Sequence, residues 1–450
     1  MKLEAPQSLN YCATVVRVKN LVKAENSDNL QIIPMFGLQA IVDLQTKVGD
    51  VGLLFPAECQ LSDEYTKANS LYRHAEKNLE PDKKGYLEDN RRVRAIKLRG
   101  NRSDALFMPL SSITMVALVD SSQSHSWFTA FEELREGDQF DRLNGIEICR
   151  KYVRPIRSLG YGAPKQTKKQ RRVEEKFFPQ HFDSANFFRI EDTLDPNADC
   201  VVTQKVHGTS IRVGNVPVTR KLSWLERLAR RLGVKVQETE FSMVYGSRKV
   251  IKDANDPEQA HYYDDDIWTH EGSKLVGLIP ENYVLYGELI GWVPGTATPI
   301  QKHFTYDCLP GTCRLYIYRV SVVNGQGTVV DLSWDALKEF CVATGLNHVV
   351  ELWRGPLGIF AEDAGLYLDT NFSRLWNDSM PTPRWLLTST SRGTPVPLSD
   401  DSPCDEGVCI RIESTIPTIV KAKSPMFLAH ETSMLDADVV DVEAEQGAVS

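Results

Sequence analysis

The segment "VVTQKVHGTSIRVG", residues 201–214, governs the interpretation of this chain. It begins with Val201 and Val202, as a buried strand would, and then places Lys205 and His207 directly before Gly208. Glycine permits a turn at which another molecule can approach the backbone closely. Lys205 is therefore either a surface lysine that happens to precede a turn or a nucleophilic amine in a phosphate pocket.

Length and composition predict a globular protein of two domains. The chain has 450 residues, 42% of them hydrophobic and 25% charged, and this length exceeds what one core usually holds. No apolar run reaches the roughly 18 residues of a membrane span, and the N-terminal "MKLEAPQSLNY" lacks a signal-peptide region. We therefore expect a soluble protein of the cytoplasm or nucleus, without a membrane partner.

Cysteine content and charge limit the choice of partners. The nine cysteines show neither a CxxC pair nor Cys/His metal spacing, which fits free thiols in a reducing compartment. The formal net charge of -8 does not by itself favour a nucleic-acid partner. Local basic patches decide such binding, however, so the net charge leaves it open.

Short strands dominate the first part of the chain. Residues 12–44 and the "GLLFPAE" segment have strand character, whereas residues 62–90 are polar and irregular. In the following "RRVRAIKLRG", Val93 and Ala95 alternate with Arg92 and Arg94, so that one face of a strand would be basic and the other buried. This pattern predicts a small barrel such as an OB-fold, or alternatively a solvated edge strand.

The chain then changes character at residues 163–176. The run "APKQTKKQRRVEEK" is charged and poor in apolar residues, and it is the predicted interdomain linker. It separates a first domain, residues 1–162, from a larger second domain, residues 177–435. The acidic residues 436–450 lack aromatic side chains and are predicted to form a disordered tail.

Residues 221–233, "KLSWLERLARRLG", predict an amphipathic helix in the second domain. Its apolar face would carry Leu222, Leu225, Leu228, Ala229 and Leu232, and arginines 227, 230 and 231 lie largely on the other face. We expect the apolar face to pack on a core. Contact of the arginines with phosphate or RNA is the alternative.

Further segments of the second domain supply groups suited to nucleotidyl transfer. "YGSRKV" contains Arg248, "YVLYGELIG" contains Glu288, "RLYIYRV" places Tyr316 and Tyr318 on one face, "DEGVCIRI" contains Glu406, and "TIVKAKSPMFL" places Lys421 and Lys423 two residues apart. Each segment alone fits an ordinary salt bridge, a solvated strand or core packing. Together they offer acids for a divalent cation, cations for phosphates and a candidate lysine nucleophile.

The order of these segments resembles that of a known superfamily. "KVHGTS", "YGSRKV", "YGELIG", "LYIYRV", "EGVCIRI" and "VKAKSPMF" occur as do motifs I, Ia, III, IIIa, IV and V of the covalent nucleotidyltransferases, which include ATP-dependent DNA and RNA ligases and capping enzymes. His207 at the third position of motif I resembles the RNA ligases. Only 27 residues follow Lys423, too few for a C-terminal barrel, so the chain is most similar to Deinococcus/Naegleria-type RNA ligases with an N-terminal OB domain.

This resemblance implies an α+β fold and an enzyme activity. The expected architecture is an N-terminal OB-fold β-barrel, followed by an ATP-grasp-like nucleotidyltransferase domain with antiparallel sheets and flanking helices. The implied activity is an ATP-dependent RNA ligase of RNA repair that works with Mg²⁺ or Mn²⁺. A lysyl-AMP forms first, AMP then passes to a 5'-phosphate end, and a 3'-hydroxyl finally displaces AMP to seal the nick.

The resemblance also implies roles for individual residues. Lys205 would be the nucleophile, and Glu288 and Glu406 would position the ribose and a metal through water. The metal would lower the lysine pKa. Lys421 and Lys423 would neutralise the α-phosphate, Arg248 would bind a phosphate or the ribose, and Tyr318 would stack on adenine. The remaining predicted ATP contacts are Gln204, Val206, His207 and Gly208, and the predicted nucleic-acid contacts are Arg92, Arg94, Lys97 and Arg99.

Two departures and several alternatives accompany this resemblance. Tyr318 is followed by Arg319 where the family usually has Asp, and Cys409 stands where an aliphatic residue is usual. The expected substrate is a nicked RNA duplex or RNA/DNA hybrid, bound by a monomer through its A-form shape rather than its base sequence. The alternatives are a ligase that accepts DNA 3'-hydroxyl ends, a GTP-using guanylyltransferase, and a catalytically silent nucleic-acid-binding relative.

Overall fold

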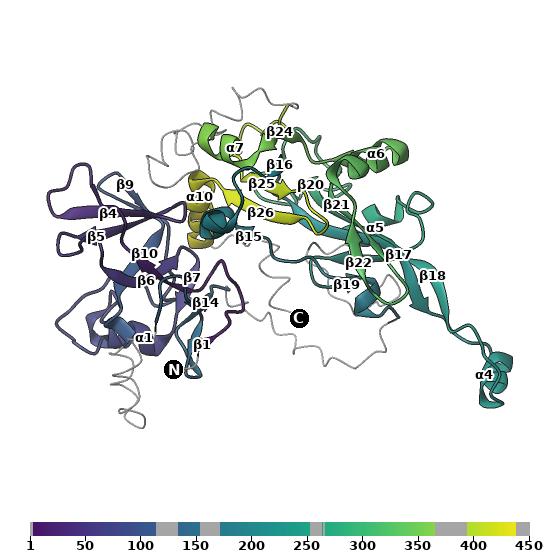
Figure 1. The fold of residues 1–450 in the computed structure, drawn as a ribbon, viewed down its shortest axis with the longest axis horizontal. Coiled ribbons are helices and arrows are strands. Elements are labelled where there is room, and N and C mark those ends of the chain that lie inside the picture. Colours follow the sequence, from purple (N-terminus) through teal and green to yellow (C-terminus); the bar gives the residue numbers. More distant parts are fainter. Residues whose placement is uncertain are drawn as a thin grey trace.

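The protein folds into an N-terminal lobe and a larger C-terminal lobe that meet side by side (Figure 1). The computed structural model describes residues 3–113, 134–153, 172–252, 263, 266–364 and 394–437. We call residues 3–153 the N-terminal lobe and residues 172–437 the C-terminal lobe. Residues 163–171 of the predicted linker and 438–450 of the predicted tail lie outside the described residues. Among the helices that are described, none is long and apolar enough to cross a membrane.

The N-terminal lobe is built on a seven-stranded sheet. Its strand order is β11 (Gln139–Phe140), β2 (Ala13–Arg17), β6 (Val51–Pro56), β10 (Ala105–Pro109), β5 (Leu38–Asp43), β4 (Leu30–Met35) and β3 (Val22–Lys23). The smaller pairings join β1 (Leu3–Glu4), β12 (Arg142–Leu143) and β13 (Ile146–Glu147), then β7 (Cys59–Leu61) with β14 (Cys149–Lys151), and β8 (Ile96–Leu98) with β9 (Asn101–Ser103). The short strands are present as predicted. The described strands do not close into a barrel, since β11 and β3 are unpaired edges of the sheet.

The polar residues 62–90 cover the core of this lobe. Helix α1 (Asp63–Ala68) begins after Ser62, whose side chain accepts a hydrogen bond from the Tyr65 backbone and so caps the helix. Tyr65 and Leu87 are buried with Phe55 of β6. The irregular segment is therefore anchored by apolar side chains rather than being a solvated loop.

Two sheets form the framework of the C-terminal lobe. The first has the order β15 (Ala185–Asn186), β26 (Thr418–Lys423), β25 (Gly407–Ile412), β16 (Asp199–Lys205) and β24 (Glu351–Pro356). The second has the order β19 (Ile251–Lys252), β18 (Thr239–Ser247), β17 (Thr209–Thr219), β20 (Tyr283–Gly291), β21 (Cys313–Val323) and β22 (Val329–Asp331), with β23 (Asn347–His348) beside β21. Most neighbouring strands are antiparallel, but β15 is parallel to β26, and β23 is parallel to β21. The fold is thus α+β with antiparallel and mixed sheets, as predicted at that level.

Helices flank these sheets. They are α3 (Phe187–Ile190), α5 (Ile267–Ser273), α6 (Trp334–Thr344), α7 (Leu357–Asp363) and α10 (Pro425–Asp436), whereas α4 (Trp224–Arg231) lies apart from the sheets (Figure 1). The described end of the predicted linker also packs on the C-terminal lobe: Val173 is buried and bridges to Val218.

The amphipathic helix of residues 221–233 exists but does not pack as expected. Helix α4 extends from the β17–β18 hairpin, away from both lobes (Figure 1), and has no buried residue. Leu225 is 58% exposed and Leu232 is 74% exposed. The prediction of a core-packed face is therefore wrong, because periodicity defines an apolar face without supplying the surface that would cover it.

Helix α10 joins the two lobes through buried polar contacts. Arg92 is 1% exposed, its Nη1 lies 3.2 Å from Glu58 Oε2, and it also pairs with Asp436 of α10. Glu58 accepts a 2.6 Å hydrogen bond from Thr432 of α10. The predicted contact of Arg92 with nucleic acid is corrected by these partners, since a buried, paired guanidinium cannot face a duplex.

Replacing Arg92 by alanine should destabilise the protein by about 3 kcal/mol, because Glu58 would remain buried without its cation. Burial already raises the pKa of Glu58, and Arg92 is the main opposing influence. Arg94→Ala is the matched control, since Arg94 is half-buried and pairs less closely with Asp436, at 3.4 Å. That change should cost less than about 1 kcal/mol. Equal losses in denaturant unfolding would contradict the assignment.

Candidate active site

A cavity of about 560 Å³ opens between the two lobes. The C-terminal lobe contributes Lys205, Glu288, Glu406, Lys421 and Lys423 to its lining. The N-terminal lobe contributes Tyr11, Arg150 and Lys151, among others. A volume of this size is suited to a nucleotide-sized ligand. All five residues that the sequence analysis predicted to be catalytic therefore line one cavity.

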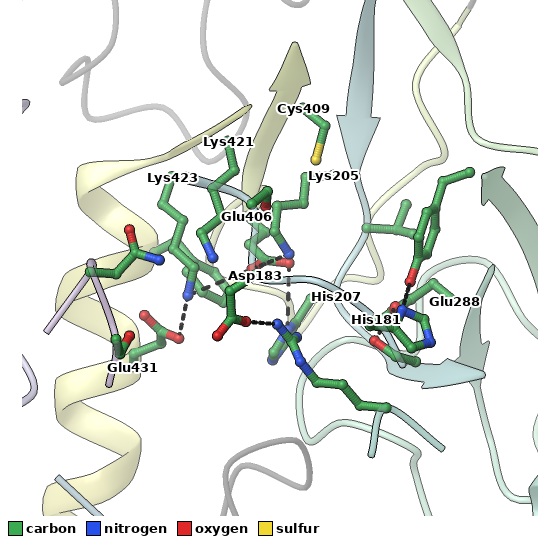
Figure 2. Close-up of a pocket in the computed structure, with 18 of the residues that line it drawn as sticks. His181, Asp183, Lys205, His207, Glu288, Glu406, Cys409, Lys421, Lys423 and Glu431 are labelled. Carbon is green, nitrogen blue, oxygen red and sulfur yellow. Dashed lines mark hydrogen bonds and ion pairs between the residues drawn. The ribbon is translucent and has the colours of Figure 1, made fainter. Parts of the chain in front are cut away.

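Strand register explains why three lysines gather in this cavity. Lys205 of β16 stands opposite Gly407 of β25, which in turn stands opposite Lys423 of β26. Cys409 stands opposite Lys421, and residues two apart on a strand share a face. Figure 2 shows the side chains of Lys205, Lys421 and Lys423 pointing to the same side.

Lys205 is held at the end of its strand by a close approach of two backbones. A side-chain carbon at Gly208 would lie 2.1 Å from the carbonyl oxygen of Leu289 in β20, so no larger residue fits. From the sequence, another molecule is expected to approach the backbone at this glycine, and the group that lies against it in this structure is β20 of the same chain. The backbone N–H of His207 donates to the Tyr306 hydroxyl at 2.6 Å, which fixes the turn further.

Glu406 is the immediate partner of Lys205. Its Oε1 lies 2.6 Å from Lys205 Nζ and 3.7 Å from Lys423 Nζ. Burial is the largest single influence and lowers the pKa of Lys205, but Glu406, together with Cys409 and Glu288, raises it, and the net pKa lies above its ordinary value. Without a ligand, Lys205 is therefore a protonated ammonium group that is 22% exposed, not a lysine in bulk solvent.

Lys421 and Lys423 differ in their surroundings. Burial, together with the charges of Lys423, Lys205 and Arg248, lowers the pKa of Lys421 to about 8. Burial also acts on Lys423, but Glu431 opposes it and the net pKa lies well above the ordinary value. Of this pair, Lys423 is therefore firmly charged, whereas Lys421 titrates close to physiological pH.

Glu288 braces the turn that follows Lys205. Its Oε1 accepts a hydrogen bond from the Gly208 backbone at 3.1 Å, and its Oε2 accepts from the Ser210 hydroxyl at 3.2 Å. Register explains both contacts, because Ser210 of β17 lies directly opposite Glu288 of β20. The carboxylate is buried yet borders the cavity.

Five of the other predicted nucleotide contacts also line the cavity, namely Gln204, Val206, His207, Arg248 and Tyr318, whereas Gly208 is not among the lining residues. Two of the five have partners that the sequence did not reveal. Arg248 pairs with Asp183. The Tyr318 hydroxyl lies 2.7 Å from His181 Nδ1. Neither Asp183 nor His181 belongs to a motif, and no pattern in the sequence signals them. The side-chain amide of Gln204 donates to Asp405 and accepts from the Val396 backbone, so this conformation uses it within the protein.

The two unusual motif residues have structural explanations. Arg319 donates from Nε to both carboxylate oxygens of Asp331, at 3.0 and 2.9 Å, and its guanidinium lies 4.6 Å from the Tyr286 ring centre. Cys409 lines the cavity on β25, the strand between β16, which carries Lys205, and β26, which carries Lys421 and Lys423. Burial raises the pKa of this thiol, although Lys205 opposes it.

The donors of this site fit a divalent cation that is shared with phosphates. Glu406 Oε2 is buried and has no hydrogen-bond partner among the described residues, and the ring nitrogen Nδ1 of His207 lies 3.6 Å from it. Carboxylates are the ligands that Mg²⁺ and Mn²⁺ prefer, and Mg²⁺ is commonly held by one or two of them plus phosphate oxygens. Among the described residues no group of three or more candidate ligands occurs, so phosphates and water would complete the shell.

Comparison with known proteins agrees with this arrangement. A sequence model of the RNA ligase family matches residues 198–423, whereas a search of curated proteins gave no match. A variant of Naegleria gruberi RNA ligase with ATP and Mn superposes with a TM-score of 0.53 at 13% identity, covering 95% of this chain and 99% of that one. A second variant, with AMP and Mn, gives 0.53 at 15% identity and covers 93% and 98%. At these identities the structures support the fold alone.

The family match spans the strand of Lys205, both glutamates and the lysine pair. It covers residues 198–423, which is half of the 450-residue chain. We conclude that this chain belongs to the RNA ligase family.

Proposed function

We propose that this protein is an ATP-dependent RNA ligase that seals 3'-hydroxyl/5'-phosphate nicks in duplexes through a lysyl-AMP intermediate. The observation that carries the proposal is the convergence of Lys205, Glu406 and Lys423 in one cavity, with Lys205 Nζ only 2.6 Å from a buried carboxylate. ATP and Mg²⁺ or Mn²⁺ are the proposed cofactors. The similar solved structures with ATP, AMP and Mn support this choice.

The first chemical step requires Lys205 to change partner and lose a proton. A neutral Nζ attacks the α-phosphorus of ATP, a P–N bond forms, and pyrophosphate leaves as the P–O bond breaks. A bound divalent cation would attract the Glu406 carboxylate, and its positive charge would lower the pKa of the Lys205 amine. Lys421 and Lys423 offset the negative charge that develops on the α-phosphate.

The two later steps use the same cavity. A 5'-phosphate oxygen attacks the AMP phosphorus, which breaks the P–N bond and returns the amine to Lys205. A 3'-hydroxyl then attacks the activated 5'-phosphorus and AMP leaves. The roles of Gln204, Val206, His207, Gly208, Arg248, Glu288 and Tyr318 in holding ATP remain part of this proposal, supported for these residues by their place around Lys205.

We also propose that residues 1–162, which include the N-terminal lobe, form an OB-type module that contacts the duplex. Lys97 and Arg99 are exposed on the β8–β9 hairpin and its turn, and they are better placed for phosphate contact than Arg94, which pairs with Asp436. Residues 177–435 would then form the adenylation domain. The proposed substrate is a nicked RNA duplex or RNA/DNA hybrid.

The function is tested with labelled nicked duplexes that carry either RNA or DNA on the 3'-hydroxyl side. With ATP and Mg²⁺ or Mn²⁺ we expect joining of the RNA-ended nick and at least roughly tenfold slower joining of the DNA-ended nick, because a 2'-hydroxyl contact distinguishes the two. Equal rates would identify a general polynucleotide ligase. No joining of either duplex would overturn the proposed sealing activity.

Binding of ATP should weaken as the pH rises above about 8. Lys421 has its pKa lowered to about 8 by burial and neighbouring cations, and phosphates of bound ATP would raise that pKa again. Binding above pH 8 therefore takes up a proton, so the dissociation constant should increase up to about tenfold per pH unit, whereas below pH 8 it should be flat.

The pH effect is measured by titrating an ATP analogue with a non-cleavable α–β phosphate bridge into the unaltered protein, because this keeps the charge of Lys205, which helps to lower the pKa of Lys421. Lys421→Arg is the matched control, because an arginine stays charged throughout this range. We expect the control to lose the pH dependence. An identical pH profile in both proteins would show that Lys421 is not the titrating group.

A further inference from the structure

Helix α10 follows directly after Lys423 and is anchored at both of its ends. At its start, the buried Phe427 packs edge-on against His207, with ring centres 4.9 Å apart. At its end, Thr432 donates to Glu58, and Asp436 pairs with Arg92 of the N-terminal lobe. The helix therefore bridges the turn after Lys205 and the N-terminal lobe.

Glu431 lies between these two anchors and faces the cavity. Its Oε1 accepts a 2.7 Å hydrogen bond from Lys423 Nζ, and its side chain is only 16% exposed. Figure 2 shows this contact approaching Lys423 from the helix side, away from Lys205. Lys423 is thus held between Glu431, Glu406 at 3.7 Å and the Phe427 ring at 5.0 Å.

Thr432, next to Glu431, links the position of Glu431 to the position of the N-terminal lobe against the C-terminal lobe. Thr432 is 3% exposed, and its hydroxyl also accepts a hydrogen bond from the Ala95 backbone at 3.1 Å. A shift of the N-terminal lobe would therefore move the helix turn that carries Glu431. A long lysine side chain has several rotamers, and fixing one of them costs conformational entropy that a close ion pair offsets.

We propose that Glu431 is a positioning residue for Lys423, and that α10 transmits the seating of the N-terminal lobe to that lysine. This inference rests on the proposed adenylation function, in which Lys423 contacts the α-phosphate. Glu431 itself does not touch the reacting atoms. Its effect passes through the location of the Lys423 ammonium group.

The test measures single-turnover label transfer from α-labelled ATP to the protein at saturating ATP. Glu431→Gln keeps the size of the side chain but removes its charge, and we expect a rate roughly 10- to 100-fold lower. Glu431→Asp should recover part of this loss because it restores the carboxylate. Glu362→Gln, an exposed change on α7, is the matched control and should leave the rate unchanged.

A double-variant cycle separates positioning from a general structural role. In a Lys423→Met background, Glu431→Gln should cause no further loss, since the residue it positions is gone. Thr432→Val should lower the rate in the otherwise unchanged protein and, likewise, not in the Lys423→Met background. If label transfer by the double variants falls below detection, the same comparison of single and double variants is made with the dissociation constant of ATP.

The outcomes distinguish this inference from the proposed function. If the unaltered protein accepts no label, the proposed function fails. If it is labelled but Glu431→Gln reacts at the same rate, Glu431 is not a positioning residue. An equal loss in the Lys423→Met background would assign Glu431 a purely structural role and overturn the inference.

Discussion

Lys205→Ala is expected to abolish transfer of label from α-labelled ATP to the protein, with a loss of at least about 1000-fold. The variant removes the only atom that would bond to the α-phosphorus, and loss of a covalent nucleophile leaves little residual reaction. The change removes the closest ion-pair partner of the buried Glu406, but Lys423 remains 3.7 Å from that carboxylate and the backbone pairing with Gly407 is retained, so the variant should fold with reduced stability. Label that stays with the protein after denaturation is the measurement.

A second lysine supplies the control for this loss. Lys221, an exposed residue before α4, lies outside the residues that line the cavity, so Lys221→Ala should keep the full rate. Persistence of labelling in Lys205→Ala would contradict the assignment of the nucleophile. Loss of labelling in both variants would point to a general defect instead.

Glu406→Gln is expected to slow label transfer by about 100-fold, because it removes a negative charge from the proposed cation site. The change has an opposing consequence. Without Glu406, burial and Lys423 would lower the pKa of Lys205, which alone would make the amine more reactive near pH 7. A net loss of rate would therefore show that the carboxylate contributes more as a cation ligand than it costs by keeping the amine protonated.

The pH dependence of the Glu406→Gln rate separates the role of Glu406 as a cation ligand from its effect on the protonation of Lys205. The Glu406→Gln rate should be lower throughout, but it should increase with pH from a lower starting pH than in the unaltered protein, since the Lys205 ammonium group loses its anionic partner. Glu362→Gln again serves as the exposed Glu-to-Gln control. A rate above that of the unaltered protein would show that Glu406 only suppresses the nucleophile.

Much of the cavity could be anticipated because its parts are short segments whose order is preserved along the chain. Lys205 and Lys423 end their strands, Glu406 directly precedes β25, and Glu288 lies within β20. Strand register then converts sequence spacing into a spatial cluster. Lys421 and Lys423 illustrate this, since residues two apart on β26 face the same side.

The errors arose where a partner lies far away in sequence. Arg92 resembles a surface cation by composition, yet its partner Asp436 is 344 residues distant. The apolar face of α4 was predicted correctly as a face, but nothing in the sequence states that the hairpin carries it away from the core. His181, Asp183 and Glu431 lie outside any motif, so only the three-dimensional arrangement brings them to the cavity.

The strands of the N-terminal lobe pair over long separations in the sequence. Alternating apolar residues predicted its short strands, but pairing across long separations, such as the parallel contact of Ala105 in β10 with Ala40 in β5, cannot be derived from local patterns. The predicted OB-type barrel accordingly remains a proposal.

Locating the covalent adduct tests the central claim most directly. After incubation of the unaltered protein with ATP and Mn²⁺, mass spectrometry of its proteolytic peptides should find AMP bonded to the side-chain nitrogen of Lys205. Addition of pyrophosphate should remove it. An adduct on another residue, or none with ATP or GTP under these conditions, would contradict the account.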